Sequence, residues 1–264
     1  MLPENIQDSL PEPGETVLTS GPVAAASQPA PREPFWGYTD LAMMIGLLTG
    51  SIVLLLVFAG LFISARPDLK TDPIFLLATQ LGLYVFVYIC FWAIFRTRYD
   101  RPVFSSLGWR RSNFSPLLAV VCGGVLAFLV ALAGSLMQTP KVKSPLDDLT
   151  STPVLLTLFG LMAITVAPLF EEMLFRGFLQ PLLSRTLGIV AGIGITASIF
   201  GAMHAPEYAM AWQYVVLIAL AGAAFGWVRA RSNSIIPCTI MHGSFNLASV
   251  IVLAVSKYAP HSLT

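Results

Sequence analysis

Residues 153–179 read PVLLTLFGLMAITVAPLFEEMLFRGFL, an apolar run that carries two adjacent acids, Glu171 and Glu172. About 20 helical residues cross the hydrocarbon core of a bilayer, so this run predicts a membrane helix. A carboxylate inside a bilayer is costly, and it persists where it faces a polar cavity, has a partner or takes part in chemistry. The stretch therefore predicts both a membrane fold and a polar site within it.

The composition of the whole chain is that of a polytopic membrane protein. Of its 264 residues, 56% are hydrophobic and only 11% are charged, and the mean hydropathy is +0.76. The net charge of +1 argues against a nucleic-acid-binding protein, which needs a basic face. The cysteines lie in apolar stretches and are predicted to be buried hydrophobic residues rather than disulfides or a CxxC metal site. They are Cys90, Cys122 and Cys238.

Four segments divide the chain. Residues 1–36 are rich in Pro, Ser, Gly and Glu, which predicts a disordered tail. They lack the basic and apolar regions of a signal peptide, so the first membrane helix is expected to act as its own insertion signal. Residues 37–140 hold the N-terminal transmembrane helices 1–3, residues 150–256 hold the core with the acidic pair, and residues 257–264 form a short tail.

The predicted fold is all-α, a polytopic bundle of transmembrane helices with a polar cavity in its C-terminal four-helix core. Helices are expected because backbone groups in a bilayer must be satisfied within the segment. Seven spans are predicted, and an eighth crossing or a re-entrant piece near residues 204–211 stays open. The seven are residues 41–63, 73–95, 115–137, 153–179, 187–204, 212–228 and 235–255.

The basic residues of the connections predict the orientation of the chain. Ten of the fifteen Lys and Arg residues fall in the N-terminal tail and in the second, fourth and sixth connections. Cytoplasmic connections carry the excess of positive charge, so the N-terminus is expected in the cytoplasm. An odd number of spans then puts the C-terminus outside. The short loops and the absence of targeting signals favour a bacterial cell membrane.

The two acids of the fourth span are expected to differ in their surroundings. On one helix, Glu172 and Arg176 are an i,i+4 pair that holds the glutamate ionised. Glu171 points about 100° away around the helix and has no partner in its own segment. A desolvated carboxyl group without a partner suits a general base or a proton shuttle. The alternative is that both acids lie at the membrane interface and are merely solvated.

Two histidines lie in apolar segments of the same half of the chain. His204 follows Phe200 by one turn, in the sequence FGAMH, and His242 precedes Asn246 by one turn, in HGSFN. A single histidine in a membrane helix is most often a hydrogen bonder between helices. Two histidines, two acids, an arginine and an amide in the last four helices are better explained by an active cavity. Ser244 faces another side of its helix and is predicted to be a packing serine.

Three motifs in this half resemble those of a known family. EEMLFRG at 171–177, FGAMH at 200–204 and HGSFN at 242–246 are similar to EExxxR, FxxxH and HxxxN/D of the CPBP family. That family comprises the type II CAAX prenyl proteases (Ras-converting enzyme) and the bacterial Abi proteins, some of which are linked to bacteriocin self-immunity. The resemblance covers about residues 150–250, and the order of the motifs is specific.

The resemblance implies an intramembrane protease that cuts a membrane-associated substrate, either CAAX-like or a leader peptide. Glu171 would activate the attacking water, which His204 would help to hold. His242 and Asn246 would stabilise the oxyanion. Such a set suffices for attack of water on a peptide carbonyl without a Ser or Cys nucleophile. The implied site residues are Glu171, Glu172, Arg176, His204, His242 and Asn246.

A metal-dependent version of the same site stays open. Glu171, His204 and His242 form a reasonable set of zinc ligands with an open position for water, although no HExxH helix is present. The expected cofactor is therefore none or one divalent metal. The expected partners are membrane lipid and a peptide or protein substrate, and no nucleic acid.

Two other classes of function compete with the protease. Intramembrane acids and histidines also mark the ion path of a proton-coupled transporter, but the sequence shows no inverted repeat. A catalytically silent immunity or scaffold protein would keep the fold and lose a motif residue, and none is lost here.

Overall fold

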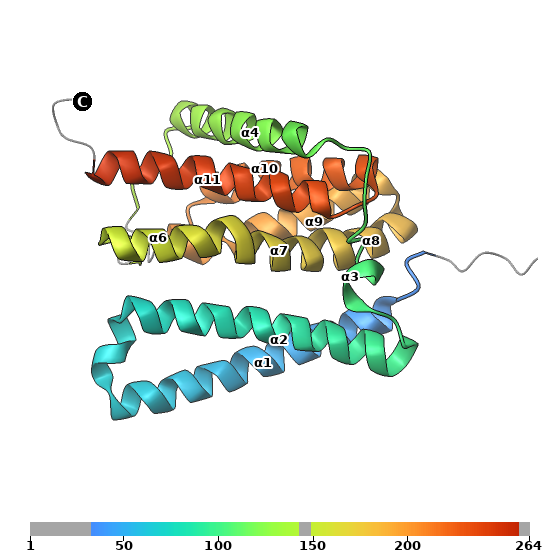
Figure 1. Ribbon diagram of the computed structural model, residues 1–264, viewed down its shortest axis with the longest axis horizontal. Coiled ribbons are helices and arrows are strands. Elements are labelled where there is room, and N and C mark those ends of the chain that lie inside the picture. Colours follow the sequence, from blue (N-terminus) through green and yellow to red (C-terminus); the bar gives the residue numbers. More distant parts are fainter. Residues whose placement is uncertain (1–32, 143–148, 259–264) are drawn as a thin grey trace, which may run out of the picture. The chain divides into compact units, whose positions relative to one another are not determined.

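The computed structural model describes residues 33–142 and 149–258, and within them it is all-helical, as predicted (Figure 1). In this described part of the chain, six helices are long and apolar enough to cross a membrane. This confirms a polytopic helical membrane protein. The six are α1 (Tyr38–Ala65), α2 (Pro73–Tyr99), α4 (Pro116–Leu136), the continuous helix Pro153–Leu187, α10 (Trp212–Ser232) and α11 (Ile236–Tyr258).

The fifth predicted span is shorter than expected. Helix α9 (Ile189–Met203) has 15 residues, which rise about 22 Å and fall short of the roughly 30 Å hydrocarbon core. It begins after Gly188, whose positive φ of 86° breaks it from the preceding helix. The region left open as an eighth crossing forms the 3₁₀ turn η4 (Ala205–Tyr208) and then a bend. Six long helices and one short apolar helix in the described residues are therefore roughly consistent with the seven predicted spans.

The fourth span is one continuous helix of changing pitch. Two π-helical segments interrupt its α-helical pattern, one on each side of the acidic pair. Such segments are rare and are found frequently at functional sites. Its parts are α6 (Pro153–Leu161), η2 (Met162–Val166), α7 (Ala167–Glu172), η3 (Met173–Leu179) and α8 (Gln180–Leu187).

The end of the predicted tail is packed rather than disordered. Trp36 is 2% exposed, its Nε1 donates to Phe178 O at 3.1 Å, and the two rings stack at 5.6 Å. Phe35 packs against the same apolar cluster. Residues 35 and 36 thus belong to the packed structure, because their aromatic rings cover the junction of α2 with the fourth span. Residues 1–32 of the predicted tail and residues 259–264 lie outside the described residues.

Small residues bring the C-terminal helices close together. A Cβ on Gly123 of α4 would lie 2.3 Å from Met241 O of α11, and one on Gly201 of α9 would lie 2.4 Å from Val215 O of α10. Figure 1 shows α4 alongside α11. Backbones at such distances leave no room for a side chain, as is usual where membrane helices pack.

The connections between the helices lie in two groups, one at each end of the bundle. At one end, Arg110 Nε of the α2–α4 connection donates to Asn233 O after α10 at 2.8 Å, and Arg185 of α8 bonds Pro34 O before α1. At the other end, Tyr214 Oη donates to Pro140 O at 3.0 Å. The connections assigned to one side of the membrane therefore share one end of the bundle.

Candidate functional site

An ion pair buried in the bundle forms the base of the site. Arg176 Nη1 lies 2.9 Å from Glu172 Oε1, and neither side chain has any exposed surface. Arg176 Nη2 also donates to Gly222 O of α10 at 2.8 Å, and the guanidinium lies 4.5 Å from the centre of the Phe200 ring. The expected i,i+4 pair is therefore present, and it is held by two neighbouring helices.

His242 of α11 extends this pair. Its Nδ1 lies 2.9 Å from Glu172 Oε1, and its ring stacks on Phe225 with centroids 4.6 Å apart and an interplanar angle of 21°. A carboxylate only accepts hydrogen bonds, so the Nδ1 proton lies on the histidine. Stacking and this bond fix the ring and direct Nε2 toward the other acid.

Glu171 is the accessible acid of the pair. Its Oε2 lies 3.8 Å from His242 Nε2, and its side chain is 21% exposed whereas that of Glu172 is fully buried. Tyr84 of α2 donates from its hydroxyl to Glu171 Oε1 at 3.4 Å. The distance of 3.8 Å is too long for a direct hydrogen bond and suits a bridging water. Glu171, His242, Glu172 and Arg176 thus form a row from an accessible acid to a buried cation.

His204 approaches the row through an aromatic neighbour. It caps the end of α9, and its Nδ1 lies 2.7 Å from Phe200 O. The Phe200 ring is 4.6 Å from the His204 ring and 5.8 Å from the His242 ring. The two histidines therefore flank one phenylalanine.

Two further residues near the site, Tyr84 and Glu207, lie outside the three sequence motifs. Glu207 of η4 interacts electrostatically with His204 and Glu171, and burial raises the pKa of its carboxyl group, opposed by the charge of His204. Tyr84 contacts Glu171 as described above. Both were missed because each is a single polar residue with no motif around it. The only signal in the sequence was that Glu207 is the one acid beyond the Glu171–Glu172 pair.

Asn246 is placed differently from the rest. Its Nδ2 donates to Ala163 O in the π-helical segment η2 at 2.7 Å, which ties α11 to the fourth span. Ser244 donates to Val120 O of α4 at 2.7 Å, as expected of a packing serine. One N–H of the Asn246 side-chain amide therefore donates to the Ala163 carbonyl, and the second N–H is left to donate elsewhere.

Glu171, His204 and His242 are not gathered into a metal site in the described part of the chain. Within residues 33–142 and 149–258, no group of three or more His, Cys, Asp or Glu side chains is arranged to hold one. His242 Nδ1 bonds Glu172 and His204 Nδ1 bonds the Phe200 carbonyl, so Nε2 of each ring is not used by these bonds. Cavities of about 310 and 420 Å³ are both lined by other residues, so the expected polar cavity at these acids stays a prediction.

A comparison with protein families agrees with the motifs. Residues 153–248 match the family model described as type II CAAX prenyl endopeptidase Rce1-like. The matched range includes all six implied site residues. Searches of curated proteins and of solved structures found no significant match.

Proposed function

We propose that this multi-pass membrane protein, whose residues 153–248 match the type II CAAX prenyl endopeptidase Rce1-like family model, is an intramembrane endopeptidase. The observation that carries the proposal is the row of Glu171, His242, Glu172 and Arg176, joined by distances of 3.8, 2.9 and 2.9 Å. An accessible acid beside an oriented imidazole is the arrangement that general-base attack of water requires.

The proposed reaction needs one mobile proton, shared by Glu171 and His242. The charges of the buried Glu172 and Arg176 cancel each other. Glu171 and His242 have no net charge together when, besides the Nδ1 proton, they share one further proton. With that proton on His242, Glu171 is a carboxylate base and His242 Nε2 is a hydrogen-bond donor. Both groups then face the same 3.8 Å gap. This state supplies a base and an oxyanion donor at one point.

The reaction then follows in two steps. Glu171 takes a proton from water as the water oxygen attacks the peptide carbonyl, and the carbonyl oxygen becomes an oxyanion. His242 Nε2–H and the free N–H of Asn246 stabilise that oxyanion. Glu171 next returns the proton to the leaving nitrogen as the carbon–nitrogen bond breaks. A new carboxyl terminus and a free amine result.

The remaining residues of the site position the His242 ring or hold the attacking water. Glu172 and Arg176 have no exposed surface, so they act through His242 by fixing its ring. His204 holds the attacking water from the end of α9, and Glu207 lies close enough to His204 for the histidine's charge to act on its carboxyl group.

The proposed reaction uses no metal. A zinc ion on Glu171, His204 and His242 would need His242 Nε2 and both other side chains to converge, and the described donors do not form such a group. Elemental analysis of the purified protein tests this assignment. A stoichiometric divalent metal whose removal abolishes cleavage would contradict it.

The proposal extends to the class of substrate and to the host membrane. The substrate is a membrane-associated peptide, CAAX-like or leader-type, which reaches Glu171 within the bundle. The N-terminus is cytoplasmic, since the connections at its end carry the excess of basic residues, and the host membrane is a bacterial cell membrane.

One comparison separates the protease from its alternatives. Peptides released from a membrane-tethered library by the wild type and by Glu171→Gln are identified, and ion flux is measured in liposomes. Products that vanish in the folded variant support the protease. Ion flux that depends on Glu171 without cleavage favours a transporter, and neither activity in the wild type favours a silent scaffold.

A further inference from the structure

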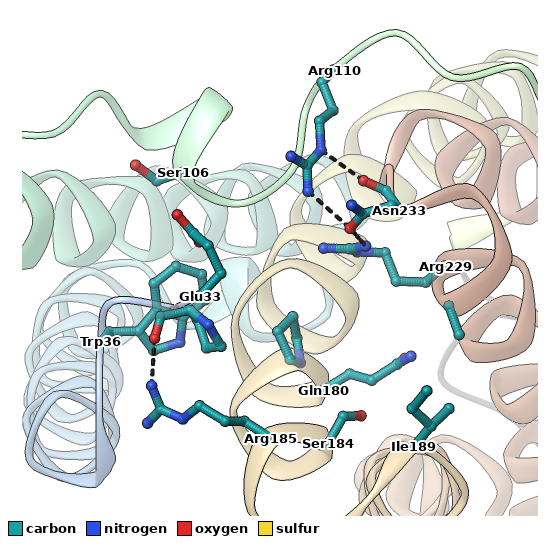
Figure 2. Close-up of a pocket in the computed structure, with 13 residues that line it drawn as sticks. Glu33, Trp36, Ser106, Arg110, Gln180, Ser184, Arg185, Ile189, Arg229 and Asn233 are labelled. Atoms are coloured by element: carbon teal, nitrogen blue, oxygen red, sulfur yellow. Dashed lines mark hydrogen bonds between the residues drawn. The ribbon is translucent and has the colours of Figure 1, made fainter. Parts of the chain in front are cut away.

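A cavity of about 310 Å³ lies at the basic end of the bundle, away from the proposed active site. It is enclosed by the residues before α1, the α2–α4 connection, α8 and the end of α10, as Figure 2 shows. Helices α2, α8 and α10 all end near it, at Tyr99, Leu187 and Ser232. The cavity therefore lies at the level where the spans leave the bilayer.

Three arginines line this cavity and keep their charge unneutralised. Arg110, Arg185 and Arg229 form no ion pair with a carboxylate within the described residues. The acceptors of Arg110 and Arg229 are neutral oxygens of Asn233 and a backbone carbonyl, and Arg185 bonds the Pro34 carbonyl. Figure 2 shows the Arg110 and Arg229 side chains meeting at Asn233.

Burial makes this arrangement costly without an anion. Arg229 is 8% exposed, and it lies close enough to Arg110 for their charges to interact. A buried cation is stabilised by a paired anion, yet the cavity lining holds three arginines and a single acid, Glu33. An anionic ligand would balance the two excess charges.

A buried acceptor completes the polar wall. Gln180 is 3% exposed, its Nε2 donates to Gly226 O at 2.9 Å, and its Oε1 has no hydrogen-bond partner within the described residues. Buried polar atoms are nearly always satisfied. The ligand should therefore bring a hydrogen-bond donor, such as a hydroxyl group, together with its negative charge.

The rim of the cavity points to a lipid as the source of that anion. Ile189 lines the cavity and is 57% exposed, and its neighbours Leu187 and Val190 are 52% and 81% exposed. These side chains begin the lipid-facing surface of α9. A headgroup in the cavity would therefore leave its acyl chains against apolar residues.

We propose that this cavity binds the phosphate headgroup of an anionic phospholipid with hydroxyl groups, of the phosphatidylglycerol type. The phosphate contacts Arg110, Arg185 and Arg229, and a headgroup hydroxyl donates to Gln180 Oε1. Basic pockets between membrane helices at the cytoplasmic surface recognise anionic headgroups in this way. The bound lipid joins the segment before α1 to α8 and α10.

The test measures lipid binding to the delipidated full-length protein in detergent. Phosphatidylglycerol, phosphatidylcholine and inorganic phosphate are titrated separately, with native mass spectrometry for lipid binding and thermal unfolding for all three. We expect phosphatidylglycerol to bind and to raise the unfolding temperature, and phosphatidylcholine to do neither. The variant Arg110→Gln with Arg185→Gln should bind phosphatidylglycerol about 30-fold more weakly, since two basic contacts are lost.

Arg231→Gln is the matched control. Arg231 lies at the same end, packs over Trp227 at 5.7 Å and does not line the cavity, so its replacement should leave binding unchanged. Equal binding of both lipids by the wild type would overturn the proposal, and this comparison stands even if the double variant fails to fold. Equal weakening by Arg231→Gln would assign the effect to general surface charge. A thermal shift with inorganic phosphate that phosphatidylglycerol does not increase would identify a free anion and refute the lipid.

Discussion

Removing one charge of the buried Glu172–Arg176 pair is expected to destabilise the fold strongly. The two groups are 2.9 Å apart and have no exposed surface. At an effective dielectric constant of 20, unit charges at this distance attract by about 6 kcal/mol. Breaking a buried pair by removing one partner typically costs about 3–5 kcal/mol. We therefore expect Glu172→Gln to lower the free energy of unfolding by about 3–5 kcal/mol.

The double variant should cost less than the sum of the single ones. Arg176→Met leaves Glu172 buried with only His242 as a partner, so it is also expected to cost about 3–5 kcal/mol. Combining Glu172→Gln with Arg176→Met removes both charges and leaves no buried ion unpaired. Its cost should fall below the sum by about 3 kcal/mol, because each single loss is mostly the penalty of the remaining charge.

The assay is a double-mutant cycle on the free energy of unfolding in micelles. The control cycle uses the pair Arg66 and Asp68, which lie 2.8 Å apart but are 68% and 62% exposed. Solvent screens an exposed pair, so this second cycle should show little coupling. Additive costs for Glu172 and Arg176, to within about 0.5 kcal/mol, would refute the reasoning that the site rests on a coupled buried pair.

Three further predictions follow from the site. Gly201→Ala puts a Cβ 2.4 Å from Val215 O. This variant should lower the free energy of unfolding by about 1–3 kcal/mol and reduce cleavage. The Cβ of the control variant Gly194→Ala meets nothing within 4 Å, so this variant should change neither stability nor cleavage. Burial raises the pKa of Glu207, so the native state binds the carboxyl proton more tightly than the unfolded state does. The free energy of unfolding should therefore fall as the pH rises through the native-state pKa. Glu207→Gln should flatten this part of the plot of unfolding free energy against pH. A chelator should leave the cleavage rate unchanged, and a loss restored by added zinc would contradict the metal-free reaction.

The local parts of the site could be predicted from the sequence. Glu172 and Arg176 pair because residues four apart on a helix are neighbours, and their spacing is visible in the chain. The contact of His242 with Glu172 joins residues 70 positions apart. Spacing alone does not give such a contact: the sequence predicted that the two residues share a site, but not that they touch.

Other features depend on tertiary packing and could not be predicted. The π-helical segments around the acids arise where the helix adapts to its neighbours, and hydrophobic periodicity does not reveal them. Tyr84 reaches Glu171 from α2, a helix that carries no motif. Trp36 follows a stretch whose composition is that of a disordered tail, yet its ring is buried against Phe178. The spans themselves were predictable because length and hydropathy determine them.

The most direct test of the account is the cleavage rate of Glu171→Gln in liposomes. Glutamine keeps the size of the side chain and removes the base, so the rate should fall by about 10²–10⁴ while the protein stays folded. Asp68→Asn, the same change at a residue 62% exposed in the α1–α2 connection, should cleave at the wild-type rate. A folded Glu171→Gln protein that releases the same peptides at the same rate as the wild type would contradict the central claim that this acid activates the water.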